Sequence, residues 1–180
     1  MTATRSQIIA SGTLVHLRAK QIEDAENDYA WRCDPELAAY DAARPLRASY
    51  KTFASTMREE LNYPTTHRRT FAIEDIESER HIGNVMYYGY DPRAGEAELG
   101  ITIGERDFWS SGYGTDAVRT MVQYLFDEIG LSRVYLHTLS WNYRAQRCFE
   151  RAGFQRVRDV QRGGHEFILM EIEPDNAPSE

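Results

Sequence analysis

The sequence contains few cysteines, and their spacing excludes two classes of protein. Of its 180 residues only Cys33 and Cys148 are cysteines, and they form no CxxC pair. A disulfide-stapled fold or a zinc knuckle needs more cysteines at closer spacing, so the chain fits a reducing cytosol. The five histidines are scattered and form no HExxH motif. We therefore interpret the histidines as structural or surface residues and expect no metal site.

Long apolar runs and blocks of basic residues are also missing. No apolar stretch approaches the ~20 residues of a membrane span, and the opening residues 1–12 are too polar and too short for a secretory signal. The net charge is −7, and no cluster of Lys and Arg suggests a nucleic-acid surface. We expect a cytoplasmic protein without a membrane or nucleic-acid partner. The acidic balance mildly favours a cationic partner.

The length and composition of the chain are those of one globular domain. The hydrophobic fraction is 42% and the charged fraction is 27%, both ordinary values for a folded protein. No internal repeat or low-complexity linker divides the chain. We expect one domain over residues 8–174 and a disordered tail over 175–180, because the ending EPDNAPSE has no periodicity.

The apolar periodicity of the first half predicts helices followed by strands. A short strand is expected at 13–19, a helix at 21–32, an irregular or briefly helical stretch at 34–46, and a helix from the N-cap Ser49 to about Asn62. The period then changes to alternation over 69–76, 81–90 and 96–104. Polar turns separate these segments, so they predict an antiparallel meander.

The second half predicts a parallel crossover and a closing hairpin. A broad apolar stripe indicates a helix over 114–130, stopped by Gly130, and 133–139 is typical of a strand covered on both faces. The strand–helix–strand unit 96–139 should be a right-handed parallel crossover. A helix over 142–152 and a hairpin around Gly163 and Gly164 follow. The expected fold is α+β, with a mixed, mostly antiparallel sheet of about six or seven strands, a central parallel pair and flanking helices.

The stretch FWSSGYGTDA, residues 108–117, places glycines at the mouth of the helix expected from Gly114. The first N–H groups of a helix have no intrahelical partners, and the helix dipole adds partial positive charge there. Phosphate is therefore a natural ligand for this turn. The alternative is a plain tight turn that begins a helix. The missing Gly-Lys-Ser/Thr argues against a nucleotide P-loop.

Three segments carry a family resemblance that covers most of the chain. They are AELGITIGERDFWSSGYGTDA at 97–117, NYRAQRCFERAGF at 142–154 and the opening GTLVHLRAKQIEDAENDYAW at 12–31. Together they resemble the Gcn5-related N-acetyltransferases (GNAT), in the branch of ribosomal-protein alanine and polyamine acetyltransferases. The resemblance implies a single-domain GNAT fold and acetyl transfer from acetyl-CoA to a primary amine, on a protein N-terminus or a small molecule such as a polyamine or aminoglycoside. The alternative is a coenzyme-A-binding sensor or scaffold without turnover. A homodimer is possible.

The resemblance also implies which residues bind coenzyme A. The pyrophosphate would lie on the backbone of Ser111, Gly112, Tyr113, Gly114 and Thr115, and the pantetheine arm would pair with Ile101, Thr102 and Ile103 like an added strand. Further contacts would come from Asn142, Arg147 and Phe149.

The chain departs from the family pattern at the phosphate turn. Ser110 and Ser111 stand where glycine and lysine are common. The cation that this lysine would bring to a phosphate is therefore missing. Arg106, Arg144 or Arg147 could replace it, since a guanidinium forks well onto phosphate oxygens.

Acetyl transfer to an amine requires a group that removes a proton. A lysine-like amine has a pKa of ~10.4 and is almost fully protonated at neutral pH. Glu98 is the candidate base, because strand alternation places it on one face with Gly100 and Thr102 and the family commonly carries an acid there. The alternative is that Glu98 only forms a salt bridge or holds the shape of the cleft.

The group that would protonate the leaving thiolate is not evident. Phe149 occupies the position where the family commonly has tyrosine, so the usual hydroxyl is absent. Ser140, Tyr143, Tyr113 or water could replace it, and we take Ser140 as the candidate. Candidate acceptor-side residues are Trp31, Tyr40, Arg44, Tyr87, Tyr88 and Tyr90, and ordinary packing is the alternative for most of them.

Overall fold

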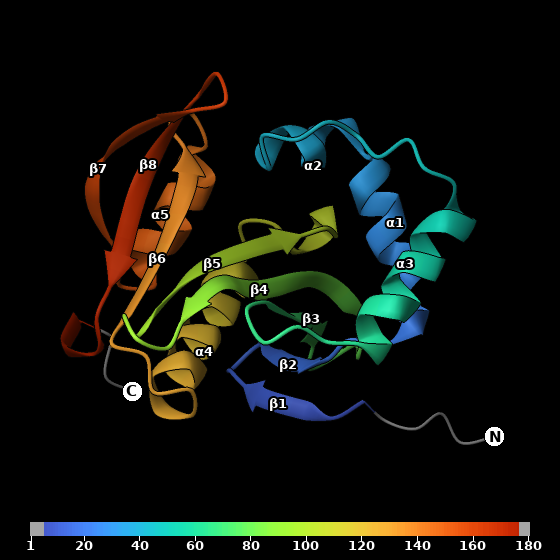
Figure 1. Ribbon diagram of the computed structural model, residues 1–180, viewed down its shortest axis with the longest axis horizontal. Coiled ribbons are helices and arrows are strands. Elements are labelled where there is room, and N and C mark those ends of the chain that lie inside the picture. Colours follow the sequence, from blue (N-terminus) through green and yellow to red (C-terminus); the bar gives the residue numbers. More distant parts are fainter. Residues whose placement is uncertain (1–5, 177–180) are drawn as a thin grey trace.

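A computed structural model describes residues 6–176, and within them one mixed sheet of eight strands forms the centre of the molecule (Figure 1). The strands are β1 (Ile8–Ser11), β2 (Val15–Ala19), β3 (Arg69–Asp75), β4 (His81–Asp91), β5 (Glu96–Ile103), β6 (Arg133–Leu139), β7 (Gln155–Arg162) and β8 (His165–Ile172). Their order in the sheet is β1-β2-β3-β4-β5-β6-β8-β7, and β5–β6 is the parallel pair. The expected α+β class and central parallel pair are confirmed.

The strand count is one higher than the upper expected value, because β1 was missed. This strand has four residues and lies at the edge of the sheet beside β2. A segment so short shows too little alternation for a strand prediction from periodicity.

The helices are α1 (Ala25–Cys33), α2 (Pro35–Tyr40), α3 (Tyr50–Asn62), α4 (Tyr113–Asp127) and α5 (Tyr143–Arg151), with 3-10 turns at Ile22–Asp24, Arg106–Phe108 and Pro174–Asn176. Two of the helices, α3 and α5, begin after the expected caps Ser49 and Asn142. Ser49 Oγ accepts from the Thr52 N–H, and Asn142 Oδ1 accepts from the Ala145 N–H, as N-cap side chains do. The turn at Pro174–Asn176 overlaps the start of the expected tail, and residues 177–180 lie outside the described part of the chain.

One face of the sheet, together with α4 and α5, forms the hydrophobic core. Alternate side chains of the central strands point to this face and are almost fully buried, among them Val15, Leu17, Phe71, Ile73, Val85 and Leu99. Helix α4 supplies Val118, Met121 and Leu125 against them. Burying one such side chain contributes ~1.5–3 kcal/mol, so this layer holds the sheet and α4 together.

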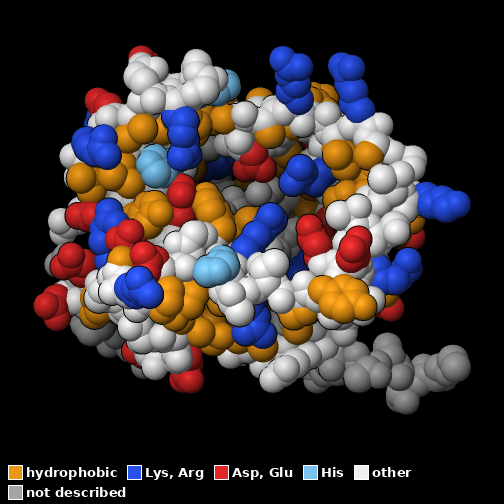
Figure 2. Space-filling model, viewed as in Figure 1, with side chains coloured by type: hydrophobic (Ala, Val, Ile, Leu, Met, Phe, Trp, Pro, Cys, Tyr) orange, Lys and Arg blue, Asp and Glu red, His pale blue; other side chains and the backbone are white. Residues whose placement is uncertain are grey.

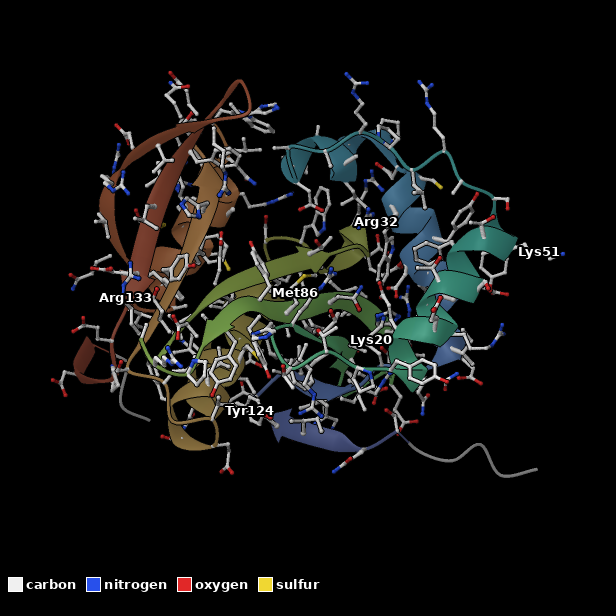
Figure 3. All side chains as sticks on the ribbon, in the orientation of Figure 1. Lys20, Arg32, Lys51, Met86, Tyr124 and Arg133 are labelled. Carbon is white, nitrogen blue, oxygen red and sulfur yellow. The ribbon has the colours of Figure 1, made fainter. Side chains whose placement is uncertain are left out.

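The opposite face of the sheet is bound to α1 through buried charges. Arg18 pairs with Asp24 at 2.8 Å, and Lys20 pairs with Asp28 at 2.7 Å. Asn84 on β4 donates to Asp28 at 2.6 Å. Figure 3 labels Lys20, which lies where the helices meet the sheet. Buried charges are tolerated when they are paired in this way, and the pairs fix how α1 docks.

Strands β5 and β6 are paired over only a short length and then diverge. The parallel ladder runs from Glu96 opposite Arg133 to Glu98 opposite Tyr135. At this closed end Arg133 binds Glu96 and Glu171, both at 2.7 Å, and its position is labelled in Figure 3. Beyond it β5 continues along β4 while β6 continues along β8, so the two strands open like a V (Figure 1).

None of the helices described within residues 6–176 is long and apolar enough to cross a membrane.

The buried charges beneath α1 predict that the protein loses stability in acid. Although burial alone would raise it, the pKa of Asp24 is lowered from 3.8 to about 2 by the Arg18 hydrogen bond and the Lys20 charge. Burial, with the charge of Lys20, lowers the pKa of His81 below its usual 6.5. Asp24 therefore contributes ~2 kcal/mol that is lost as the pH falls from 3.8 toward 2. His81 destabilises the fold below pH 6.5, where the unfolded chain takes up its proton first.

Urea unfolding at a series of pH values measures both effects. We expect the free energy of unfolding to fall between pH 7 and 5, and to fall again below pH 4. His81→Gln should remove most of the first decrease and leave the second. A wild-type stability that stays constant from pH 7 to 5 would contradict the assignment of His81.

Candidate functional site

The opening between β5 and β6 is a cleft of about 620 Å³. Its walls come from the diverging strands, the start of α4, the inner side of α5 and the end of α2. Figure 2 shows this face of the molecule hollowed near its centre. The residues named from the sequence that line the cleft include Tyr40, Tyr88, Glu98, Ile101, Thr102, Ile103, Gly112, Gly114, Thr115, Asn142, Arg147 and Phe149.

Four candidate acceptor residues do not line this cleft: Trp31, Arg44, Tyr87 and Tyr90. Trp31 is 8% exposed, and its Nε1 donates to Glu105. Its indole covers Gly104 so closely that a Cβ there would lie 2.1 Å from the ring. Trp31 therefore packs the end of β5 into place. Arg44 lies exposed on the loop after α2, and Tyr87 is buried in the core against Phe71.

The hydroxyl groups expected near the thiolate also lie elsewhere. Ser140 and Tyr143 line a separate cavity of about 270 Å³. The Tyr113 hydroxyl forms a hydrogen bond with Asp75, away from the cleft. The Ser111 hydroxyl donates to the Trp109 carbonyl. Ser140 follows directly after β6 in the sequence, but its side chain lines the separate cavity and not the cleft.

The turn before α4 has the backbone conformation of an anion-binding loop. Gly112 is the N-cap and has φ +91°, and Ser110 two residues earlier has φ +59°. Left-handed residues interleaved with ordinary ones turn successive N–H groups to one side. The free N–H groups of the first helical turn, at Tyr113 and Gly114, add to this cradle. Gly114 lies directly against α5, where a Cβ would be 3.3 Å from Cys148 Sγ.

The start of α4 is anchored from the N-terminal hairpin. The Asp116 carboxylate, in the first turn of α4, accepts from the N–H groups of Thr13, Leu14 and Val15 at 2.8–3.1 Å. A carboxylate at this end of a helix is also favourable for the helix dipole. These bonds hold the turn before α4 in a fixed position relative to β2.

The three arginines proposed as replacements for the missing lysine have different surroundings. Arg106 pairs with Asp34 at 2.9 Å and Glu36 at 2.7 Å outside the cleft, so it is not available for a phosphate. Arg144 lines the cleft but stacks on Trp109, with Cζ 3.7 Å from the ring centre. Arg147 lines the cleft and has no ion-pair partner among the described residues. Of the three, Arg147 is the free cation on the α5 wall.

The open edge of β5 directs backbone polar groups into the cleft. Gly104 N–H donates to Ile82 O on β4, which sets the alternation of the antiparallel ladder. Ile101 and Ile103 therefore point their N–H and C=O groups away from β4. On that side Trp109 Nε1 donates to Ile103 O at 2.7 Å. The groups of Ile101 can accept an added strand-like ligand, whereas Thr102 offers its side chain only.

At the apex of the cleft, Glu98 forms a buried cluster with two neighbours. Glu98 is 8% exposed, and its Oε1 lies 2.7 Å from His137 Nδ1. The hydroxyl of Tyr88, opposite Glu98 on β4, also bonds to this carboxylate. Burial, with the charge of Glu98, raises the pKa of Tyr88 well above its usual range, so Tyr88 is a hydrogen-bond donor.

His137 is a cleft residue that the sequence analysis did not single out. It belongs to no motif, and it was grouped with the structural histidines. The signal that could have found it is register, because Glu98 and His137 lie on adjacent parallel strands and point to the same face. That register is visible only once the pairing of β5 with β6 is known.

The sequence matches known proteins over most of its length. The family model described as an acetyltransferase (GNAT) domain matches residues 15–155. The chain is 26% identical over 150 residues to the uncharacterized N-acetyltransferase p20 of Bacillus licheniformis, covering 81% of this chain and 83% of that protein. It is 40% identical over 49 residues to a kanamycin resistance protein of Rhizobium radiobacter, covering 27% and 45%.

Solved structures share the fold. Spermidine N-acetyltransferase from Vibrio cholerae in complex with CoA and spermine superposes with a TM-score of 0.80 at 19% identity, covering 91% of this chain and 98% of that one. The aminoglycoside acetyltransferase AAC(6')-Ib in complex with coenzyme A gives a TM-score of 0.71 at 19% identity, covering 90% and 96%.

Proposed function

The chain belongs to the GNAT acetyltransferase family, and from this premise we propose that it transfers an acetyl group from acetyl-CoA to a primary amine. The observation that carries the proposal is the parting of β5 and β6 after Glu98. This parting leaves a strand edge, a helix N-terminus and a buried carboxylate around one cleft.

The donor would bind along β5 and across the start of α4. The pantetheine amides would pair with the exposed backbone of Ile101, in the manner of β-strand addition. The pyrophosphate would lie on the N–H groups that follow Gly112, with Arg147 as its cation. Asn142 and Phe149 on the α5 side line the same cleft and would contact the rest of the arm.

The reaction is a direct attack on the thioester. The amine nitrogen bonds to the carbonyl carbon and loses a proton, the C–S bond breaks, and coenzyme A leaves as the thiolate. The proton would pass to the cluster of Glu98 and His137 at the apex of the cleft. The attack requires a neutral amine, so an ammonium group first gives one proton to solvent, and the proton that passes to the cluster is the one that leaves the nitrogen as the C–N bond forms.

The leaving thiolate can depart without a protein acid. A thiol of ordinary acidity has a pKa of ~8.5, so its conjugate base is a tolerable leaving group near neutral pH. Ser140 and Tyr143 face another cavity, and Phe149 has no hydroxyl. We propose that solvent in the cleft protonates the sulfur.

The acceptor we propose is a small molecule with a primary amine. The names of the similar proteins support this class, since they include a spermidine acetyltransferase, an aminoglycoside acetyltransferase and a kanamycin resistance protein. A protein N-terminus is the competing acceptor.

Release of free thiol from acetyl-CoA tests the activity. The purified chain would be assayed with spermidine, kanamycin, simple alkylamines and a short peptide with a free N-terminus. We expect amine-dependent thiol release and an acetylated product by mass spectrometry with at least one small amine. Acetyl-CoA binding without thiol release from any amine would instead support a coenzyme-A sensor.

A matched pair of glycine substitutions tests the phosphate cradle. Gly112 and Gly130 both have left-handed backbones, with φ +91° and +79°, and both have room for a methyl group. Alanine at either site should cost ~1–2 kcal/mol of stability. At Gly112 the added Cβ would point toward Leu14 rather than into the cleft. Affinity would therefore fall because the strained turn relaxes and its N–H groups rotate away from the pyrophosphate.

Calorimetric titration with acetyl-CoA measures the difference between the two variants. Gly112→Ala should bind at least about tenfold more weakly (~1.4 kcal/mol), and Gly130→Ala should bind like wild type. Equal affinities of the two variants for acetyl-CoA, at equal melting temperatures, would show that the turn at Gly112 does not take part in binding.

A tyrosine at position 149 tests whether a hydroxyl there helps the thiolate to leave. Phe149 lines the cleft and is 7% exposed, whereas Phe154 beside it is 3% exposed and lies only in the core. Phe149→Tyr should fold normally and keep or modestly raise kcat. Phe154→Tyr should lower the melting temperature, because its hydroxyl has no partner in the core. A tenfold loss of kcat in a folded Phe149→Tyr protein would show that this position needs a dry apolar surface.

A further inference from the structure

We propose that His137 is the group that accepts the proton of the acceptor amine, and that Glu98 is the positioning residue that orients its imidazole. The inference rests on the acetyl transfer proposed above and assigns the base within it. It reverses the expectation that Glu98 itself takes the proton.

The parting of the strands places His137 where an acceptor would react. The β5–β6 ladder ends with Glu98 opposite Tyr135. His137 would pair with Gly100 if the ladder continued, so it is the first residue of its face on β6 beyond the split. Both Glu98 and His137 line the cleft. The imidazole therefore lies beside the β5 edge along which the thioester is proposed to bind.

Hydrogen bonding fixes which imidazole nitrogen is the base. A carboxylate only accepts hydrogen bonds, so the ring nitrogen 2.7 Å from Glu98 Oε1 must carry the hydrogen. In the neutral ring the other nitrogen then has a free lone pair.

The free nitrogen of His137 is accessible from the cleft. Among the described residues, every fully buried side-chain nitrogen or oxygen has a hydrogen-bond partner. The second ring nitrogen of His137 has none, so this nitrogen is not fully buried. The nitrogen with the lone pair must therefore be reachable from the space in the cleft. Both side chains are largely buried, 14% exposed for His137 and 10% for Glu98, but the Glu98 carboxylate already receives hydrogen bonds from His137 and Tyr88. Accessibility to the substrate is the first requirement of a general base.

The groups around His137 hold its imidazole in place. The rings of Tyr135 and Phe167 lie edge-on to it, with their centres 6.1 and 6.4 Å from the imidazole centre. Arg162 of β7 lies over Phe167, with its Cζ 5.5 Å from the ring centre, and it lines the same cleft. The hydrogen bond to Glu98 and the two ring contacts together keep the imidazole in one orientation.

Each proton that moves in the step has a donor and an acceptor. As the amine nitrogen bonds to the acetyl carbon, its proton moves to the free nitrogen of His137, and Glu98 keeps the hydrogen on the other nitrogen in place. The C–S bond breaks and the imidazolium returns one proton to solvent, while solvent protonates the thiolate. The net products are the N-acetyl amine and coenzyme A thiol.

The dependence of kcat/KM on pH separates the two roles. With the best amine from the panel, His137→Gln should lower kcat by about 10²-fold and remove the acid limb of the profile. Glu98→Gln should also lower kcat, but it should keep an acid limb, displaced to lower pH because the imidazolium loses its carboxylate. The KM for acetyl-CoA should change little in either variant.

A histidine on the neighbouring strand provides the matched control. His165 of β8 also contacts Phe167, with the two ring centres 6.2 Å apart, but it does not line the cleft. His165→Gln should keep the wild-type rate and profile. If Glu98→Gln loses the acid limb while His137→Gln keeps it, Glu98 is the base and the proposal is wrong.

The tautomer of His137 gives a readout that does not depend on activity. Nitrogen-15 NMR should show His137 protonated on Nδ1 and unprotonated on Nε2 in the wild type, with this signature lost in Glu98→Leu. A wild-type ring protonated on Nε2 would overturn the assignment. Acetyl-CoA binding without turnover of any amine would overturn the proposed function and the base together. If the wild type turns over an amine and His137→Gln turns it over at the same rate, only the assignment of the base is overturned.

Discussion

The site depends on one interruption of backbone hydrogen bonding, the parting of β5 from β6 after Glu98. Beyond that residue each strand keeps its outer partner, β4 or β8, and loses its inner one. Unpaired strand groups are costly when buried, so such an opening persists only if something else satisfies them. Trp109 satisfies the carbonyl of Ile103. The backbone of Ile101 remains open to the cleft, in the position where an amide-bearing ligand would complete the sheet.

The two faces of the sheet stabilise this opening in different ways. The face toward α4 is apolar and close-packed, and it fixes the helix whose start forms one wall of the cleft. The other face is polar and anchors α1 through ion pairs that are nearly excluded from solvent. Trp31 of α1 then packs on Gly104 and makes an edge contact with His81. The end of β5 is therefore held by the helix that the buried charges position.

The cleft holds arginines on α5, whereas the turn before α4 has Ser111 where the family commonly has lysine. A lysine in the turn would bring a flexible cation, whereas Arg147 brings a forked one from α5. Arg144, one turn earlier on the same helix, is instead held between the rings of Tyr40 and Trp109. This stack joins α2, the turn before α4 and α5 over one side of the cleft. Of these two arginines of α5, Arg144 is therefore engaged by aromatic rings and Arg147 is the one proposed to bind the pyrophosphate.

The sequence by itself determined every element whose signal is local. Periodicity predicted the meander, the crossover and the hairpin, and the capping side chains of Ser49 and Asn142 marked two helix starts. The segments 97–117, which includes the glycine turn, and 142–154 predicted the family. Only the tertiary structure decided which of the named side chains meet. Ser140, Trp31 and Arg106 are near the cleft in the chain but face away from it, because face and partner depend on strand register and helix rotation. The pairing of Glu98 with His137 joins residues 39 positions apart, so no local pattern contains it.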